Sequence, residues 1–153
     1  MGKHKNEIPI LKALIYEEMG KEELARESLK TWLDYIRKNS SPTTYKLEEN
    51  TQLGRYDLKE GRIDSAKARL AEIESLLPEA DPSFSKMYYK PLLDSLHAEV
   101  LLAEGSLEEA AAVGKKVSYP RVNPRNGHII ASYNTYFSRD VLARIYIQRG
   151  RIG

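Results

Sequence analysis

The side chains in this sequence that could perform acid-base chemistry include three pairs of adjacent glutamates. Paired carboxylates can act as general acid and general base when they face one another across a cleft. Adjacent residues of a helix, however, point about 100° apart. Solvated helix faces and interactions with the positive end of a helix dipole therefore explain these pairs better than catalysis does. The pairs are Glu17-Glu18, Glu48-Glu49 and Glu108-Glu109.

The histidines give no stronger indication of a reactive centre. His4, His97 and His128 lie far apart without the spacing of metal ligands, and no HExxH, glycine-rich phosphate loop or Gly-x-Ser-x-Gly motif occurs. His97 shares a predicted helix with Asp94 and Glu99, which is more typical of a packed histidine than of a site. The chain has no cysteine, which excludes disulfides and thiolate chemistry. We therefore predict no catalytic residue, no cofactor and no metal site, and the protein is predicted not to be an enzyme.

Length and composition predict one folded domain over residues 1–153. The chain has 153 residues, of which 41% are hydrophobic and 30% charged, which is too apolar for a disordered protein. No apolar run is long enough to cross a membrane, and the first residues lack the pattern of a signal peptide. No membrane association is expected. The lack of cysteine leaves the compartment open, with the cytoplasm favoured.

Charge is distributed unevenly along the chain. Residues 1–114 hold 16 Lys/Arg and 21 Asp/Glu, whereas residues 115–153 hold 8 and 1. This basic segment could bind nucleic acid or an acidic partner. It lacks a groove-reading motif, so a solvated surface is the favoured interpretation and nucleic-acid binding the alternative. Its basic residues are Lys115, Lys116, Arg121, Arg125, Arg139, Arg144, Arg149 and Arg151.

The elements that must position these side chains are predicted to be helices. Apolar residues recur three and four apart through almost the whole chain, and no convincing alternating strand pattern occurs. Pro91 is predicted to kink the fifth helix, because one apolar stripe runs from Phe84 to Leu92; the alternative is that Pro91 marks the start of that helix. The seven predicted helices cover residues 6–19, 22–38, 44–60, 63–77, 83–104, 107–117 and 131–149.

A glycine-centred pattern recurs along these helices. Gly20, Gly61, Gly105 and Gly150 are 41, 44 and 45 residues apart. Each is predicted to end a helix in the left-handed conformation, which costs glycine almost nothing. Small residues flank the turns, which would let two antiparallel helices approach closely. These are Ala13, Gly54, Ala98 and Ala143 seven residues before each glycine, and Ala25, Ala66 and Ala110 five residues after the first three.

This pattern resembles the tetratricopeptide repeat family. Residues 53–78 match best, through Leu53-Gly54, Gly61, Ala66, Leu70 and Pro78. Asp57 stands where that family has an aromatic residue, Gly114 stands where it has a large one, and the spacing exceeds its usual period of about 34 residues. The resemblance implies an all-α, right-handed solenoid of stacked helical hairpins, with repeats at about 6–38, 44–77 and 83–117 and a partial repeat at 131–153.

The resemblance also implies a function. Such arrays are scaffolds that bind a peptide or protein segment on their concave face, and in bacterial proteins they often accompany catalytic, sensor or DNA-binding domains. We therefore expect a non-enzymatic protein-binding scaffold from a larger regulatory or signalling protein, with no small-molecule substrate. The candidate partner-binding residues are Arg55, Tyr88, Glu99, Tyr136, Phe137, Asp140 and Arg144.

The same repeat register assigns a set of residues to the inner face of the helices. Family members that grip a C-terminal carboxylate use Lys, Asn and Arg on successive first helices. The residues at comparable places do not form that clamp. They are Glu7, Ile10 and Leu14, then Glu48, Thr51 and Arg55, then Leu92, Ser95 and Glu99, then Phe137, Asp140 and Arg144.

The sequence stops inside the fourth copy of the pattern, so a fragment of a longer protein is expected. The last predicted helix would then expose some of its apolar residues, which are Val141, Leu142, Ile145, Tyr146 and Ile147. Exposed apolar surface favours association. Self-association through this helix is the hypothesis that follows.

Overall fold

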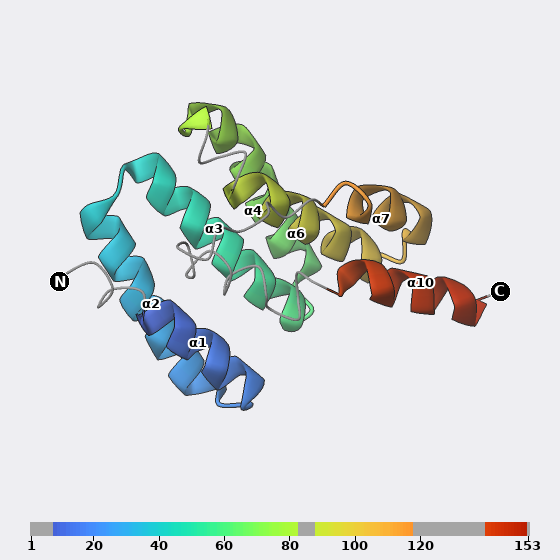
Figure 1. The fold of residues 1–153 in the computed structure, drawn as a ribbon, viewed down its shortest axis with the longest axis horizontal. Helices are drawn as coiled ribbons and strands as arrows, with labels where there is room; N and C mark the ends of the chain where they lie inside the picture. Colours follow the sequence, from blue (N-terminus) through green and yellow to red (C-terminus); the bar gives the residue numbers. More distant parts are fainter. Residues whose placement is uncertain (1–7, 83–87, 118–139, 153) are drawn as a thin grey trace, which may run out of the picture. The chain divides into compact units, whose positions relative to one another are not determined.

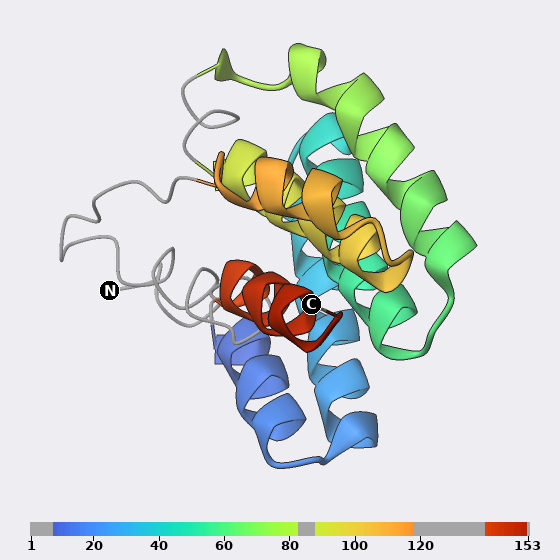
Figure 2. The ribbon, with the colours of Figure 1, turned by 90° about the vertical axis from the view of Figure 1, so that its right-hand side faces the viewer.

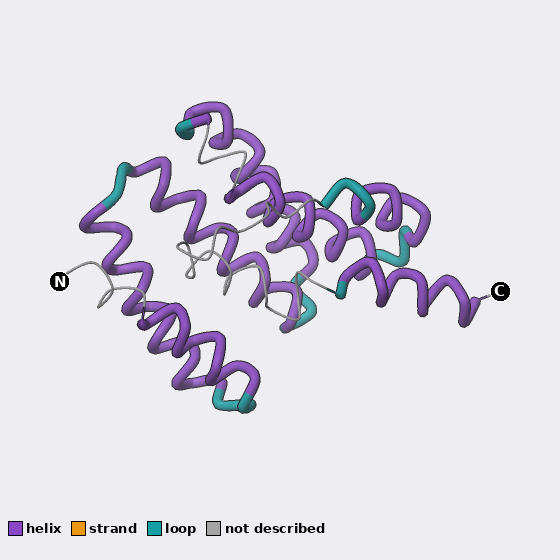
Figure 3. The backbone as a smooth tube through the Cα atoms, viewed as in Figure 1, coloured by secondary structure: helices purple, strands orange, loops and turns teal. Residues whose placement is uncertain are grey.

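The computed structural model describes residues 8–82, 88–117 and 140–152, and within them the chain is all-α (Figures 1 and 3). The described residues form seven α-helices and one short 3-10 helix, without a strand. The all-helical prediction is confirmed. The chain divides into two compact units, residues 1–45 and 46–153, which we call unit 1 and unit 2.

The helices follow one another closely along the chain. Unit 1 contains α1 (Ile8–Glu18) and α2 (Glu22–Asn39), and α3 (Pro42–Lys59) continues from unit 1 into unit 2. The remaining elements belong to unit 2. They are α4 (Ile63–Leu76), the 3-10 helix η2 (Leu77–Glu79), α6 (Lys90–Ala103), α7 (Leu107–Gly114) and α10 (Val141–Ile152).

Three of the four predicted glycine turns are confirmed. Gly20, Gly61 and Gly105 have φ of 68°, 73° and 80°. At each turn the glycine N–H donates to the carbonyl three residues earlier, and the next N–H donates to the carbonyl five residues earlier, as Arg62 does to Asp57 over 2.8 Å. This Schellman pairing satisfies carbonyls that the end of a helix leaves open. The same local chemistry therefore ends α1, α3 and α6.

The prediction for Gly150 is wrong. α10 continues through Gly150 to Ile152, and this glycine does not have a positive φ. Glycine permits the left-handed conformation but does not impose it. At the three confirmed turns a second helix packs back on the first one, and within the described residues no helix follows Gly150.

Small residues mark the close approaches within the hairpins. Ala13 of α1 and Ala25 of α2 are buried, and α1 packs against α2. Ala98 of α6 and Ala110 of α7 are both fully buried in the second packed pair. Ala143 is the exception, because it is exposed on α10.

Gly54 has a packing role of its own in α3. A Cβ added there would lie 3.0 Å from Leu96 Cδ2 of α6 and 3.8 Å from Arg69 Cβ of α4. Contacts as short as 3.0 Å force the neighbouring atoms to move. The absence of a side chain at Gly54 is therefore what lets α6 lie close to α3.

α6 covers Lys90–Ala103 of the helix that is predicted over 83–104. α6 begins at Lys90, with Pro91 in its first turn, and Tyr88 and Tyr89 form a π-helical turn just before it. Proline fits the first turn because its missing N–H has no helical partner there. Because Tyr88 and Tyr89 are already helical, helical backbone reaches Pro91 from its N-terminal side, and the kink at Pro91 stays a prediction. Residues 83–87, and residues 131–139 of the last predicted helix, lie outside the described part.

Unit 2 has two apolar clusters, and Figures 1 and 2 both show α10 beside α7. The first cluster joins α3, α4 and the beginning of α6; it contains Leu47, Leu70, Ile73, Tyr88, Tyr89, Leu92, Leu93 and Leu96. The second joins α6, α7 and α10; it contains Ala98, Leu102, Ala110, Ala111, Val141 and Ile145.

Candidate functional site

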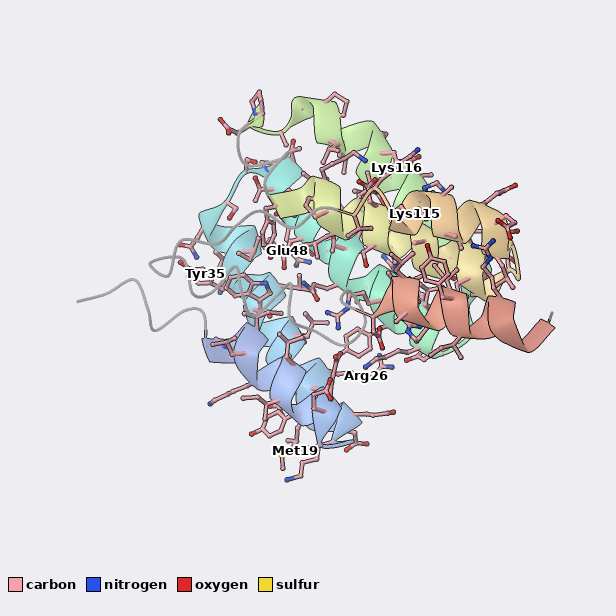
Figure 4. All side chains as sticks on the ribbon, turned by 45° about the vertical axis from the view of Figure 1, so that its right-hand side comes forward. Met19, Arg26, Tyr35, Glu48, Lys115 and Lys116 are labelled. Atoms are coloured by element: carbon pink, nitrogen blue, oxygen red, sulfur yellow. The ribbon has the colours of Figure 1, made fainter. Side chains whose placement is uncertain are left out.

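One face of α3 carries polar side chains that are nevertheless buried. Glu48, Gln52 and Arg55 are spaced four and three residues apart, so they lie along one stripe of the helix. Gln52 donates to Glu48 and Arg55 donates to Gln52, both over 3.0 Å. Tyr89 directly precedes α6, and its hydroxyl lies 3.5 Å from Oε2 of Glu48. Figure 4 labels Glu48 on α3.

A second group of charges joins α6 to the beginning of α10. Arg144 donates to the Glu99 carboxylate of α6, and its Nε donates to Asp140 over 3.0 Å. The charge of Arg55 also acts on Glu99, so the α3 stripe and this group are electrostatically linked. We call the whole set the central polar network. Its members are Glu48, Gln52, Arg55, Tyr89, Glu99, Asp140 and Arg144.

The fold changes the proton affinity of Glu99. Burial raises the pKa of the Glu99 carboxyl to about 7, and the hydrogen bond and charge of Arg144 oppose this rise without cancelling it. Arg144 donates to Asp140 as well as to Glu99, so its charge stabilises the ionised form of Glu99 less than an unshared arginine would. Burial likewise raises the pKa of the Tyr89 hydroxyl, and the neighbouring negative charge of Glu48 adds to that rise. The network therefore contains a carboxyl group that titrates near neutral pH.

Ser95 lies one helical turn before Glu99 and is also buried. Its hydroxyl has no hydrogen-bond partner among the described residues. A buried hydroxyl without a partner costs free energy. The Ser95 hydroxyl is therefore a buried polar group that the packing of this face of α6 does not explain.

Asp57 is a site that the sequence did not reveal. Its carboxylate accepts hydrogen bonds from Arg62 over 2.5 Å and from Arg69 over 2.5 Å. Burial raises the pKa of the Asp57 carboxyl, but these two arginines outweigh burial and hold the pKa below its ordinary value. Arg69 also reaches Asn50, over 3.3 Å. Asp57 therefore links α3 to α4 across the Gly61 turn, and its role is structural.

The structure brings together four of the seven candidate residues. Arg55, Glu99, Asp140 and Arg144 all belong to the central polar network. Tyr88 lies elsewhere, buried in the apolar cluster of α3, α4 and α6, with its ring centroid 4.9 Å from that of Tyr89. The other two, Tyr136 and Phe137, lie outside the described residues.

Sequence reasoning missed two members of the network. Gln52 and Tyr89 were not on the predicted inner face, although Gln52 follows Glu48 at the spacing of helical neighbours. Thr51 was on that face, yet its hydroxyl donates to the Leu47 carbonyl over 2.7 Å. The signal for Gln52 was therefore present in the spacing, whereas Tyr89 depends on how α6 begins.

The basic segment is partly neutralised where it is described. Arg144 pairs with Glu99 and Asp140, and Arg149 pairs with Glu108 of α7 over 2.7 Å. Lys115 and Lys116 are exposed directly after α7 (Figure 4). Arg121, Arg125 and Arg139 lie outside the described residues. In the described part of the chain, no helix is both long and apolar enough to span a bilayer.

Comparison of the chain with protein-family models, with curated proteins and with solved structures found no match.

Proposed function

We propose that this protein is a tetratricopeptide-like scaffold, a right-handed stack of helical hairpins, that binds a peptide or protein segment without catalysing a reaction. The repeated Schellman turns at Gly20, Gly61 and Gly105 support the repeat architecture, because one turn chemistry ends three helices at nearly constant spacing. In this proposal the chain is the partner-binding part of a larger regulatory or signalling protein.

The central polar network is the observation that carries the binding proposal. Five of its seven members stand at positions that the repeat register assigns to the inner face, namely Glu48, Arg55, Glu99, Asp140 and Arg144. Buried ion pairs contribute little stability relative to apolar residues of similar size. Helices that only had to stack would be served better by apolar residues there. We infer that these charges are kept for recognition.

The exposed end of the network indicates how a partner would engage it. The side chains of Asp140 and Arg144 are 38% and 29% exposed, whereas Glu99 is 5% exposed. A partner peptide therefore meets Asp140 and Arg144 first, and a carboxylate or guanidinium of the peptide would replace part of their mutual ion pair. Charged or strongly polar peptides fit such a site better than apolar ones.

Peptide selection on the purified chain tests this proposal. Displayed random peptides would be selected on the immobilised protein, and the selected peptides would be synthesised and titrated by calorimetry. Arg144→Gln should weaken their binding at least about tenfold, or about 1.4 kcal/mol, because a charged contact is lost. Lys67→Gln is the matched control, since Lys67 pairs with Glu104 over 2.6 Å in a separate surface ion pair.

Two results would contradict the proposal. The selected peptides could bind the wild type and Arg144→Gln equally, with circular dichroism showing that both are folded. Alternatively, the chain could yield no peptide and instead bind random DNA or RNA in a salt-dependent manner, which would support the nucleic-acid alternative.

A further inference from the structure

α10 is attached to the rest of unit 2 by few buried side chains. Among its described side chains, only Val141 and Ile145 are buried, in the cluster with α6 and α7. Gly114 of α7 makes the contact close, since a Cβ added there would lie 3.2 Å from Leu142 Cδ1. A helix of 12 residues is marginal in water by itself. α10 is therefore expected to open more readily than the rest of unit 2.

One of the contacts that α10 makes is with a buried carboxylate. Glu99 of α6 is 5% exposed, and Arg144 of α10 donates to it while also donating to Asp140 over 3.0 Å. The charge of Arg55 in α3 acts on Glu99 as well. α10 thus brings one positive and one negative charge to Glu99, which offset each other in part, while its packing keeps water away from the carboxylate. Docking of α10 therefore disfavours the ionised form of Glu99.

Other charges on α6 and on the helices packed against it have partners of their own or face solvent. Glu48 of α3 contacts Gln52 and Tyr89. Glu109, at an exposed position of α7, and Lys115 and Lys116, which follow that helix, face solvent. The remaining charges form ion pairs, which are Lys67–Glu104, Arg69–Asp57, Lys90–Asp94 and Arg149–Glu108.

The docked and detached states of α10 therefore differ in their affinity for a proton. In the docked state burial raises the pKa of Glu99 to about 7, from an ordinary value of 4.5. In the detached state water would reach the carboxylate and Arg55 would still favour its ionised form, so the pKa would lie near the ordinary value. A docked α10 thus holds a proton that the detached state releases. This contribution to docking is largest below about pH 4.5 and is lost as the pH rises to about 7.

We propose that α10 is a pH-sensitive element, whose docking on α6 and α7 weakens as the solution changes from mildly acidic to mildly alkaline and Glu99 ionises. Detachment uncovers Val141 and Ile145 and removes Asp140 and Arg144 from the central polar network. The proposal does not rest on the proposed peptide binding, because α10 docks or detaches whether or not a peptide is present.

Amide hydrogen exchange of the whole chain, followed by NMR, measures this opening. Each protection factor compares the observed exchange rate with the intrinsic rate at the same pH, so the pH dependence of the exchange chemistry cancels. The protection factors of Ile145 and Ile147 in α10 should be at least about tenfold below those of Leu70 and Ile73 in α4, because α10 opens first. Between pH 5.5 and pH 7.5 the α10 protection factors should fall about twentyfold.

Two variants assign the effect to Glu99. In Glu99→Gln the protection of α10 should change less than about twofold over this pH range, because glutamine does not titrate. Glu109→Gln, at an exposed position of α7, is the matched control and should keep the pH dependence of the wild type. Histidine ordinarily titrates in the same pH range, and His97 is present in both variants, so their comparison separates Glu99 from His97. Circular dichroism checks that both variants are folded.

Three results would overturn the proposal. The α10 amides could be protected as strongly as those of α4 at both pH values, which would show that α10 opens only when the whole unit unfolds. Their protection factors could be the same at pH 5.5 and pH 7.5 in the wild type. Finally, the fall in protection could persist in Glu99→Gln, which would assign the pH dependence to another group.

Discussion

At the scale of single residues, Glu99 is a carboxyl group whose proton affinity is set by packing. Its pKa is about 7 in the fold, raised by burial from an ordinary value of 4.5. The folded chain therefore keeps a proton that the unfolded chain releases, so the contribution of Glu99 to stability is largest below about pH 4.5 and is lost as the pH rises to about 7. The Arg144–Glu99 ion pair does not prevent the rise in the pKa of Glu99, because Arg144 also pairs with Asp140.

Glu99→Gln should remove that part of the pH dependence. The wild type should lose about 3 kcal/mol of unfolding free energy, relative to Glu99→Gln, between pH 4.5 and pH 7.5. Urea unfolding at four pH values across this window measures the difference. Glu109→Gln, at an exposed position of α7, is the control and should follow the wild type. A wild-type curve parallel to that of Glu99→Gln would show that burial does not raise this pKa.

Two glycines offer a paired test of backbone conformation. Gly61 has φ of 73° and Gly150 is helical, and a Cβ would meet nothing within 4 Å at either position. Gly61→Ala should destabilise the fold by about 1 kcal/mol, because alanine is strained in the left-handed region. Gly150→Ala should stabilise it by up to about 1 kcal/mol, because alanine favours a helix. Denaturant unfolding measures both, and changes of the same sign would be inconsistent with this assignment.

At the scale of elements, the α3–α4 hairpin depends on one carboxylate. Asp57→Ala should cost about 2 kcal/mol, since two arginines lose their common partner and both are partly exposed to water. Because the pKa of Asp57 is lowered, the wild-type contribution is present above about pH 4 and is lost as the pH falls. Urea unfolding at pH 7 and pH 3 tests both statements. Asp64→Ala, exposed in the first turn of α4, should cost less than half as much.

The approach of α6 to α3 depends on the missing side chain at Gly54. Gly54→Val should destabilise the protein by about 2 kcal/mol, because a branched side chain would meet Leu96. The double variant Gly54→Val with Leu96→Ala should lose less stability than the two single variants lose together, because alanine at position 96 makes room for the valine. Strict additivity of the two free-energy changes would place Gly54 outside this contact.

At the scale of the whole molecule, the two units differ in how much core they contain. Unit 1 buries few large apolar side chains, among them Ile10 and Leu29, whereas unit 2 holds two apolar clusters. Short helical hairpins with little buried surface are marginal in water. Residues 40–153 should therefore unfold cooperatively by themselves, and residues 1–41 should show little helix by circular dichroism. A helical, cooperatively unfolding 1–41 fragment would contradict this.

Much of the fold could be predicted because it depends on local chemistry. Helical periodicity located every described α-helix, and glycine followed five residues later by alanine located the three turns at Gly20, Gly61 and Gly105. The candidate site was predicted in part for the same reason, since helical spacing placed Arg55, Glu99 and Arg144 on one side of their helices. Tyr88 carried no such information, because an aromatic at helical spacing suits a groove and a core equally well.

The sequence by itself determined the helices, their apolar faces and the glycine turns at 20, 61 and 105, because each depends on residues a few positions apart. Only the tertiary structure decided that Arg144 contacts Glu99 from 45 positions away, that Asp57 binds two arginines, and that Tyr146 and Ile147 of α10 stay exposed. Partners so distant in sequence are chosen by how helices pack, and packing is a property of the assembled chain that no local pattern contains.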